Sequence, residues 1–342
     1  MVKKSLFKKY TAAVLGCGKI GLLWEFLPKR PKPATHIGAF LKHSRIELLA
    51  AAEPNSEHRA VAQKFLKKIP VYQTAEELFQ NHRPEIIALA TPDELHLRGV
   101  ELAVKNGVKL IICEKPIATN LVDGQRIIDL CEKSGVILLI NHMRRFDKLL
   151  AQVVADLRGE KYGKIQQIRC LYPNGLLNNG THAIDFIRWA VGEAEKVFGW
   201  KNNYPSFTHR GDYNVDGILE MQNGGRAVFQ SVNKEDYSVF EIEFYGTKGA
   251  VLVRNLGFTI DILPVQKSFL FAGLSELNFE KTKRSTKYRS FFAGMADHAV
   301  ACLDGKIKPI SRGEDGLMDL RVLLALRRSA ETGQSVKISE IS

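Results

Sequence analysis

The side chain best placed for chemistry is a lysine that directly follows an apolar run. Lys115 comes after Glu114 and the four residues Leu110–Cys113, and Pro116 ends the run. Such a segment is typical of a strand buried on both faces of a parallel sheet, and ligands bind beyond the carboxyl ends of such strands. A lysine there can stabilise a developing alkoxide. A solvated Glu-Lys pair at a strand end is the alternative interpretation.

A second candidate is His182, because the ordinary pKa of histidine lies close to neutral pH and suits a general base. It stands just before a predicted helix over 184–191. Asp185 lies inside that segment. We expect its main role to be an interaction with the positive end of the helix dipole.

A glycine-rich loop follows the first predicted strand, Tyr10–Leu15. Its glycines have the G-x-G-x-x-G spacing, which permits a tight turn and lets the backbone approach a pyrophosphate closely. Directly after a strand, this motif predicts a dinucleotide site formed by Gly16, Gly18, Lys19, Ile20 and Gly21.

The next predicted strand, Ile46–Ala52, ends at Glu53. An acid there would bind the ribose hydroxyls of NAD and repel a 2′-phosphate, so we expect NAD, with NADP as the alternative if Arg59 reaches the phosphate. Glu53 lies 32 positions after Gly21 instead of about 20. The prolines within 24–33 cannot continue a helix, so we expect a surface insertion there, or alternatively a loop that contacts substrate. Thr35 would then cap a helix over 36–43.

Two patterns divide the chain. Apolar runs at 71–72, 85–90, 108–113 and 136–141 alternate with helical segments at 57–67, 75–80, 93–106 and 123–133, which indicates a doubly wound parallel sheet. From residue 164, short alternating runs separated by glycine-rich turns predict a mostly antiparallel sheet. We therefore expect an α/β dinucleotide-binding domain at 1–121 and an α+β domain at 122–342.

Three segments resemble the Gfo/Idh/MocA family, the NAD(P)-dependent oxidoreductases related to glucose-fructose oxidoreductase and inositol dehydrogenase. They are the glycine loop, the block ATPDELHLRGVELAVKNGVKLIICEKPIA and the run GLLNNGTHAIDFIRWAVGE. The resemblance implies catalytic roles for Lys115 and His182, with a cis peptide bond before Pro116. It further implies substrate contacts at Asn178, Asp185 and Arg145, and cofactor contacts at Thr91, Pro92, His96, Glu114 and Lys115.

The resemblance also implies that the second domain binds substrate and forms a homodimer or homotetramer through its sheet. Asn178 departs from the family pattern, in which an aspartate stands four residues before the histidine. An amide cannot take a proton, but it can orient a hydroxyl group. Two functions stay open: a dehydrogenase or ketoreductase acting on a sugar, a sugar derivative or a nucleotide-linked sugar, and a dinucleotide-binding regulatory or scaffold protein without turnover. Lys115 and His182 favour the enzyme.

The amino-acid composition limits the kinds of ligand and partner that we expect. The net charge of +12 favours an anionic substrate, but the basic clusters are not interleaved with aromatic residues, so nucleic acid is not expected. Five cysteines without a C-x-x-C pair or a histidine at ligand spacing predict neither disulfides nor a metal site. The basic opening MVKKSLFKKY lacks a signal-peptide pattern after it, and no run is long enough for a membrane span. We expect a cytoplasmic protein.

Overall fold

The computed structural model describes residues 8–206 and 211–341. The chain forms two compact units, one made of Met1–Asp147 with Arg289–Leu317 and the other of Lys148–Tyr288 with Met318–Ser342. This division differs from the boundary expected at 121/122, because α5 (Leu121–Lys133) and β6 (Ile137–Ile140) belong to the first unit. β6 pairs with β5 (Leu110–Cys113) and would lose those ladder hydrogen bonds if it left the sheet. The first seven residues of the basic opening lie outside the described part.

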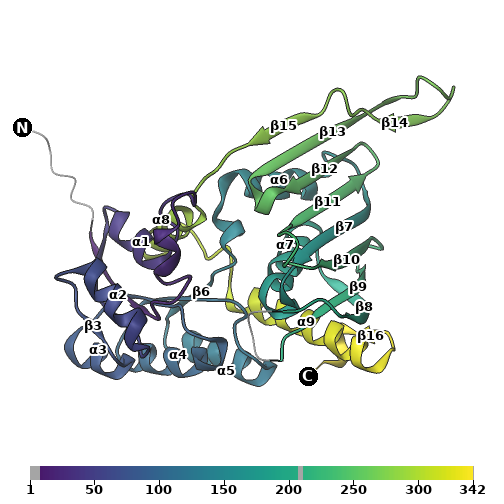
Figure 1. Ribbon diagram of the computed structural model, residues 1–342. Coiled ribbons are helices and arrows are strands. Elements are labelled where there is room, and N and C mark those ends of the chain that lie inside the picture. The colour runs from purple at the N-terminus through teal and green to yellow at the C-terminus, as the bar shows by residue number, and fades with distance from the viewer. Residues whose placement is uncertain (1–7, 207–210, 342) are drawn as a thin grey trace, which may run out of the picture. The chain divides into compact units, whose positions relative to one another are not determined.

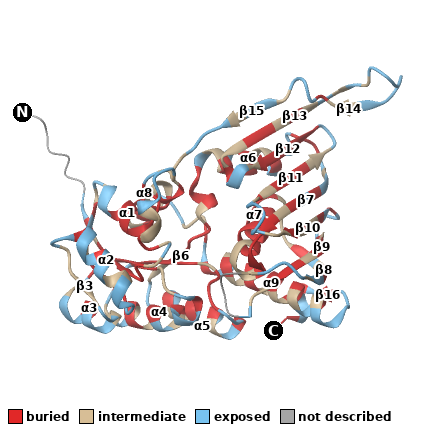
Figure 2. Ribbon diagram, in the orientation of Figure 1, coloured by how far each residue is buried: buried red, intermediate tan, exposed pale blue. Residues whose placement is uncertain are grey.

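The first unit contains a six-stranded parallel sheet in the order β3-β2-β1-β4-β5-β6. This is the strand order of dinucleotide-binding folds, with the crevice at the point where the order reverses. All residues of β4 and β5 are buried, as expected for a sheet covered on both faces, whereas α5 carries both buried and exposed residues (Figure 2). The doubly wound prediction is confirmed. The other strands are β1 (Tyr10–Leu15), β2 (Ile46–Ala52), β3 (Val71–Tyr72) and β4 (Ile86–Leu89).

Several helices of this unit begin at a side-chain cap. Thr35 accepts a hydrogen bond from the Gly38 N–H group at the start of α1, as predicted. Thr74 and Glu77 form a reciprocal capping box at α3. The helix expected from Asp93 begins instead with a 3-10 turn, Asp93–Leu95. Besides α5, the helices of this unit are α1 (His36–Lys42), α2 (Ser56–Leu66), α3 (Ala75–Asn81), α4 (His96–Lys105) and α8 (Phe291–Leu303).

A loop spanning 22–34 follows the glycine loop, where an insertion was expected at 24–33. The His36 N–H group donates to the Ile20 carbonyl (3.2 Å) and the Ile37 N–H group to the Gly21 carbonyl (3.1 Å). The carbonyl groups just before the loop are therefore bonded by the first N–H groups of α1, and the loop between them has 13 residues. Without this loop the spacing from Gly21 to Glu53 would fall from 32 to 19, close to the usual value of about 20.

The insertion has its own internal contacts. The Glu25 carboxylate accepts hydrogen bonds from the Ala34 N–H group (2.8 Å) and the Thr35 hydroxyl (2.9 Å). The Arg30 guanidinium lies 4.1 Å from the centre of the Trp24 ring, within the range of a cation–π interaction. These contacts make the insertion a folded element that ends directly at the cap of α1.

The second unit is built on a sheet in the order β14-β13-β12-β11-β7-β10-β9-β8-β16, with β15 paired to β13 (Figure 1). Neighbouring strands are antiparallel except β7 and β10, which confirms the mostly antiparallel prediction. Phe186 of α7 packs on Phe244 of β11, with ring centres 6.2 Å apart, so α7 covers one face of the sheet.

The strands of this sheet are β7 (Ile165–Pro173), β8 (Ala194–Asn202), β9 (Asn214–Met221), β10 (Arg226–Val232), β11 (Glu241–Gly246), β12 (Gly249–Arg254), β13 (Thr259–Lys267), β14 (Ser275–Leu277), β15 (Lys283–Thr286) and β16 (Val336–Lys337). The helices are α6 (Lys148–Arg158), α7 (Thr181–Val191) and α9 (Gly313–Thr332). None of the helices within 8–206 and 211–341 is long and apolar enough to cross a membrane.

Candidate cofactor and catalytic site

The glycine loop has the shape that a dinucleotide requires. Gly16 has a φ of +95°, and a Cβ atom there would lie 2.4 Å from the Ala90 carbonyl oxygen. A Cβ atom on Gly21 would lie 2.0 Å from the Gly16 carbonyl oxygen, whereas one on Gly18 would meet no atom within 4 Å. The backbone beside Gly18 is therefore open, as an approaching pyrophosphate needs. Lys19 is exposed and Ile20 half-buried next to this opening.

Glu53 lies against the glycine loop. Its carboxylate accepts hydrogen bonds from the Cys17 N–H group (2.6 Å) and the Asn55 N–H group (2.9 Å). Arg59 donates to the carbonyl oxygens of Glu53 and Pro54, both at 2.8 Å. The acid expected to select NAD and the arginine that could oppose this preference are thus neighbours at the end of β2.

The loop after β4 contacts the buried side chain of His96. Thr91 and Pro92 follow the strand, and the His96 ring is 1% exposed. Its Nε2 atom lies 3.1 Å from the Thr91 carbonyl and its Nδ1 atom 3.2 Å from the Ile117 carbonyl. Burial lowers the pKa of His96 below its usual value. Both ring nitrogens of His96 thus face backbone carbonyls, and its contact with a cofactor stays a prediction.

Glu114 and Lys115 follow β5, and the Lys115–Pro116 bond is cis, as predicted. Lys115 is half-buried, and Glu114 is 7% exposed. The Glu114 carboxylate lies 2.8 Å from His36 Nε2 and accepts a hydrogen bond from Asn141 Nδ2 (2.6 Å). Burial alone would raise the pKa of Glu114, but His36, Lys115 and Asn141 together hold it below its ordinary value. An ionised carboxylate therefore stands directly before the candidate lysine.

Sequence reasoning missed His36 and Asn141. The insertion displaces His36 from the glycine loop, which hid its position relative to the motif. Asn141 directly follows β6, and the rule that ligands bind beyond the carboxyl ends of parallel strands could have identified it.

Arg145 has partners inside its own unit. Its side chain is 5% exposed, its Nη1 atom donates to the Ile310 carbonyl (2.9 Å), and it lies 3.3 Å from the Asp315 carboxylate. These contacts join Arg145 to the segment at the start of α9. A substrate contact of Arg145 stays a prediction. His142, between β6 and the turn that carries Arg145, is also buried.

In the second unit, Asn178 and His182 lie where a π-helical run leads into α7. The run Gly175–Gly180 is π-helical and leads directly into α7, and such wide turns occur frequently at functional sites. His182 is the second residue of α7 and is 7% exposed. Asn178 is half-buried and donates to the Asn174 carbonyl (3.3 Å).

A neighbouring loop holds the start of the π-helical run. The Asp212 carboxylate accepts a hydrogen bond from the Leu177 N–H group (3.1 Å), and the Asn214 side-chain oxygen accepts one from the Gly175 N–H group (2.8 Å). Neither residue was singled out from the sequence, because both lie far along the chain and only the fold brings them here.

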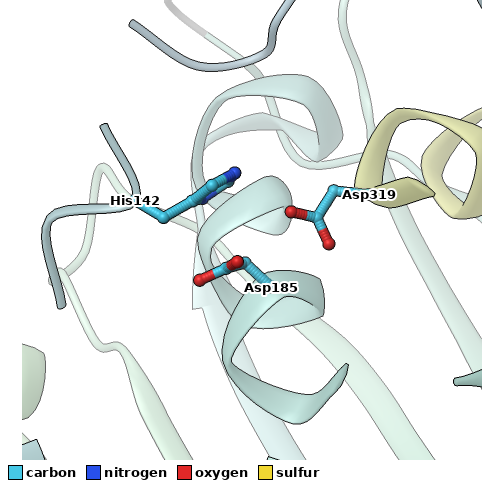
Figure 3. Close-up of side chains that lie close together, drawn as sticks. All are labelled: His142, Asp185 and Asp319. Atoms are coloured by element: carbon cyan, nitrogen blue, oxygen red, sulfur yellow. The ribbon is translucent and has the colours of Figure 1, made fainter. Parts of the chain in front are cut away.

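Asp185 lies beyond the first turn of α7, so the expected interaction with the helix dipole is wrong. The reason is that helical backbone already begins at Gly175. The Asp185 side chain is 2% exposed, and its carboxylate faces Asp319 of α9, with oxygen atoms within 4.8 Å of each other (Figure 3). Arg188 forms ion pairs with Asp319 and with Glu193 (2.6 Å), which offsets part of this negative charge.

Family models match most of the chain. Residues 11–142 match the model described as an oxidoreductase family with an NAD-binding Rossmann fold, and residues 175–338 match the C-terminal alpha/beta domain of the same family. The myo-inositol 2-dehydrogenase of Thermotoga maritima is 25% identical over 79% of this chain and 84% of its own length. The D-apiose dehydrogenase of Paraburkholderia graminis is 28% identical over 98% of this chain and 91% of its own length.

Solved structures share the fold. The WlbA dehydrogenase from Bordetella pertussis, crystallised with NADH and UDP-GlcNAcA, superposes with a TM-score of 0.75 at 20% identity, over 96% of this chain and 99% of the other. The scyllo-inositol dehydrogenase from Lactobacillus casei also gives a TM-score of 0.75 at 20% identity, over 97% and 99%. The alternative of a regulatory protein without turnover finds no support among these relatives. The glycine loop, the Glu-Lys-Pro turn and both family matches agree: this chain belongs to the Gfo/Idh/MocA family of NAD(P)-dependent oxidoreductases.

Proposed function

We propose that the protein transfers a hydride between a nicotinamide and a CH–OH carbon of a sugar, a sugar derivative or a nucleotide-linked sugar. The nicotinamide, when bound, supplies the hydride chemistry. Lys115 stabilises the negative charge that develops on the substrate oxygen, and His182 holds the proton as general base. The observation that carries this proposal is the buried, ionised Glu114 next to the half-buried Lys115 at the end of β5.

The substrate class rests on the relatives and on charge. Relatives at 24–25% identity include a myo-inositol 2-dehydrogenase, a D-xylose 1-dehydrogenase and a 1,5-anhydro-D-fructose reductase. The net charge of +12 favours an anionic derivative. In this proposal Asn178 orients a substrate hydroxyl, because its amide can both donate and accept, and Asp185 lies on the same helix as His182.

The cofactor is NAD in this proposal, because Glu53 would repel a 2′-phosphate. Gly16, Gly18, Lys19, Ile20 and Gly21 would hold the pyrophosphate, and Thr91 and Pro92 border the same edge of the sheet. NADP binding would require Arg59 to turn away from the two carbonyl oxygens that it now contacts.

We further propose that the second unit forms a homodimer or homotetramer through its sheet. A recess on this sheet is lined by Arg169, Glu241, Glu243 and Arg254, and balanced charges of both signs allow a surface to meet its own copy across a two-fold axis. The five cysteines are buried free thiols, which favours a reducing, cytoplasmic compartment.

A cofactor screen followed by a substrate panel tests the proposal. Mass spectrometry of the purified protein would identify a retained dinucleotide, and a panel of sugars, inositols and nucleotide-linked sugars would be read at the nicotinamide absorbance. Turnover of one class with NAD is the expected result. Failure to bind any nicotinamide dinucleotide would contradict the proposal.

A further inference from the structure

Three buried polar side chains meet at the carboxyl edge of the first sheet. His36 comes from α1, Glu114 from the end of β5 and Asn141 from the end of β6, and they are 0%, 7% and 2% exposed. His36 Nε2 and Asn141 Nδ2 both contact the same oxygen, Oε1 of Glu114, at 2.8 and 2.6 Å. The ring of Phe292 packs edge-on against His36, with centres 5.1 Å apart.

This arrangement fixes the charge of Glu114. A buried carboxylate is costly unless it is paired and hydrogen-bonded. Here two nitrogen atoms lie at one oxygen atom, and Lys115 adds a positive charge. Since an ionised carboxylate accepts hydrogen bonds only, the His36 Nε2 atom must carry the proton of this contact. The ring orientation is therefore set by Glu114, and the ionisation of Glu114 is in turn supported by His36.

The charge of Glu114 acts on the next residue. An opposite charge nearby favours the charged form of a lysine, and Lys115 is the cation of the proposed reaction. We propose that His36 is a positioning residue: together with Asn141 it keeps the Glu114 carboxylate ionised and in place, and through that carboxylate it keeps Lys115 charged and oriented. This inference rests on the proposed function of Lys115 and extends it to a residue that does not itself touch substrate.

The insertion gives His36 its support. Thr35 caps α1 and donates to Glu25, and the Ser290 hydroxyl at the start of α8 donates to the Pro33 carbonyl. The residues immediately before His36 are thus fixed from two sides. The 22–34 loop therefore ends in a rigid support for the imidazole ring.

The other titratable groups near Glu114 do not replace His36. His96 of α4 and Cys113 of β5 both sense the Glu114 charge. Burial lowers the pKa of His96 and raises the pKa of the Cys113 thiol, so both groups are neutral near pH 7. His36 and Lys115 are the titratable groups that stabilise the ionised carboxylate.

The test compares His36→Phe, His36→Gln, Glu114→Gln and the double variant His36→Phe/Glu114→Gln. His36→Phe should reduce kcat by about tenfold to a hundredfold, and as the pH is lowered its activity should be lost at a higher pH than in the wild type. The sign follows because His36 holds the pKa of Glu114 down, so the carboxylate takes up a proton more readily without it. His36→Gln should recover most of the activity, since its amide N–H group can donate in place of Nε2. His43→Gln, at the other end of α1, is the control and should match the wild type.

The double variant shows whether His36 acts through Glu114 or independently of it. Because His36 acts through Glu114, the double variant should be no slower than Glu114→Gln alone. Multiplied effects would overturn the inference, as would a His36→Phe variant whose activity falls at the same pH as in the wild type when the pH is lowered. Thermal unfolding at pH 7 identifies variants that fail to fold, and in that case His36→Gln, which keeps the donor, supplies the comparison with Glu114→Gln.

A second measurement needs no turnover. The lowered pKa of Glu114 contributes stability that is present above its unfolded value of about 4.3 and is lost as pH falls through the lower folded value. His36→Phe should therefore destabilise the protein at pH 7, and the difference from the wild type should shrink below about pH 4. A difference that is independent of pH would contradict the inference. A wild type without turnover on any substrate would instead contradict the proposed function, and this measurement would still decide the role of His36.

Discussion

At the scale of single residues, we propose that Glu53 decides the choice between NAD and NADP. Its carboxylate contacts the glycine loop, where the ribose of the adenosine would bind. Glu53→Ala should raise the ratio of NADP to NAD affinity by about tenfold or more, since a hydrogen bond to a charged group is worth about 1.5–3 kcal/mol. The ratio within one variant cancels any general loss of stability.

Fluorescence titration with both reduced cofactors measures this ratio. Glu57→Ala, in the first turn of α2, is the matched control and should leave the ratio unchanged. If the wild type already binds NADPH more tightly than NADH, Glu53 is not the selecting residue, and Arg59 must turn toward the phosphate.

We propose that Asn178 acts in substrate binding more than in proton transfer, because an amide can orient a hydroxyl group but cannot take a proton. Asn178→Ala should raise KM severalfold and leave kcat within about threefold, because the lost interaction exists in both the ground state and the transition state. Steady-state kinetics on the substrate found by the panel would show this split. A fall in kcat with an unchanged KM would instead place Asn178 in the chemical step.

At the scale of elements, we expect two glycines of the same loop to have different roles, Gly21 in folding and Gly18 in dinucleotide binding. A Cβ atom on Gly21 would lie 2.0 Å from the Gly16 carbonyl oxygen, whereas Gly18 has open space. Gly21→Ala should therefore lower the free energy of unfolding by about 1–3 kcal/mol. Gly18→Ala should fold normally but bind dinucleotide at least tenfold more weakly, because the added methyl group occupies the path of the pyrophosphate. Thermal unfolding with and without NADH distinguishes the two effects, and equal behaviour of both variants would contradict this account.

Most elements were predictable because their signals are local. Apolar runs marked each strand of the parallel sheet, and Thr35 marked the start of α1. The π-helical run Gly175–Gly180 was not predictable, since contacts from Asp212 and Asn214 support it and both lie more than 30 residues away. That error shifted the helix start and led to the wrong interpretation of Asp185.

Site residues were predictable where a local sequence motif determines their position. They were not predictable where their position depends on tertiary contacts. Lys115 and Glu53 follow strands, so the carboxyl-end rule located them. Ile310, which contacts Arg145, and Ile117, which contacts His96, lie 165 and 21 positions away in the sequence, which left the inward orientation of these two side chains unforeseen. The division of units at Asp147 was missed for the same reason, because the return of Arg289–Leu317 to the first unit is a long-range contact.

At the scale of the whole molecule, the open face of the second sheet is the proposed contact between subunits. Arg254 lies 2.9 Å from Glu243 and 3.9 Å from the buried Asp261. Arg254→Glu would add a fourth negative charge beside Glu241, Glu243 and Asp261, and both copies would carry it across a two-fold interface. This variant should therefore dissociate to monomers at micromolar concentration, as measured by light scattering, whereas Lys133→Glu on α5 should not. A monomeric wild type would contradict the proposed assembly.

The central claim is that Lys115 and His182 carry out the proton and charge chemistry of a nicotinamide-dependent oxidation. Its most direct test is the rate of NADH formation by the wild type, Lys115→Ala and His182→Ala on one substrate from the panel, with NADH affinity measured in parallel. We predict that each substitution lowers kcat by about a hundredfold or more while NADH binding by His182→Ala stays within about threefold of the wild type. Wild-type turnover in His182→Ala would contradict the account, because the proton would then have to leave through another group.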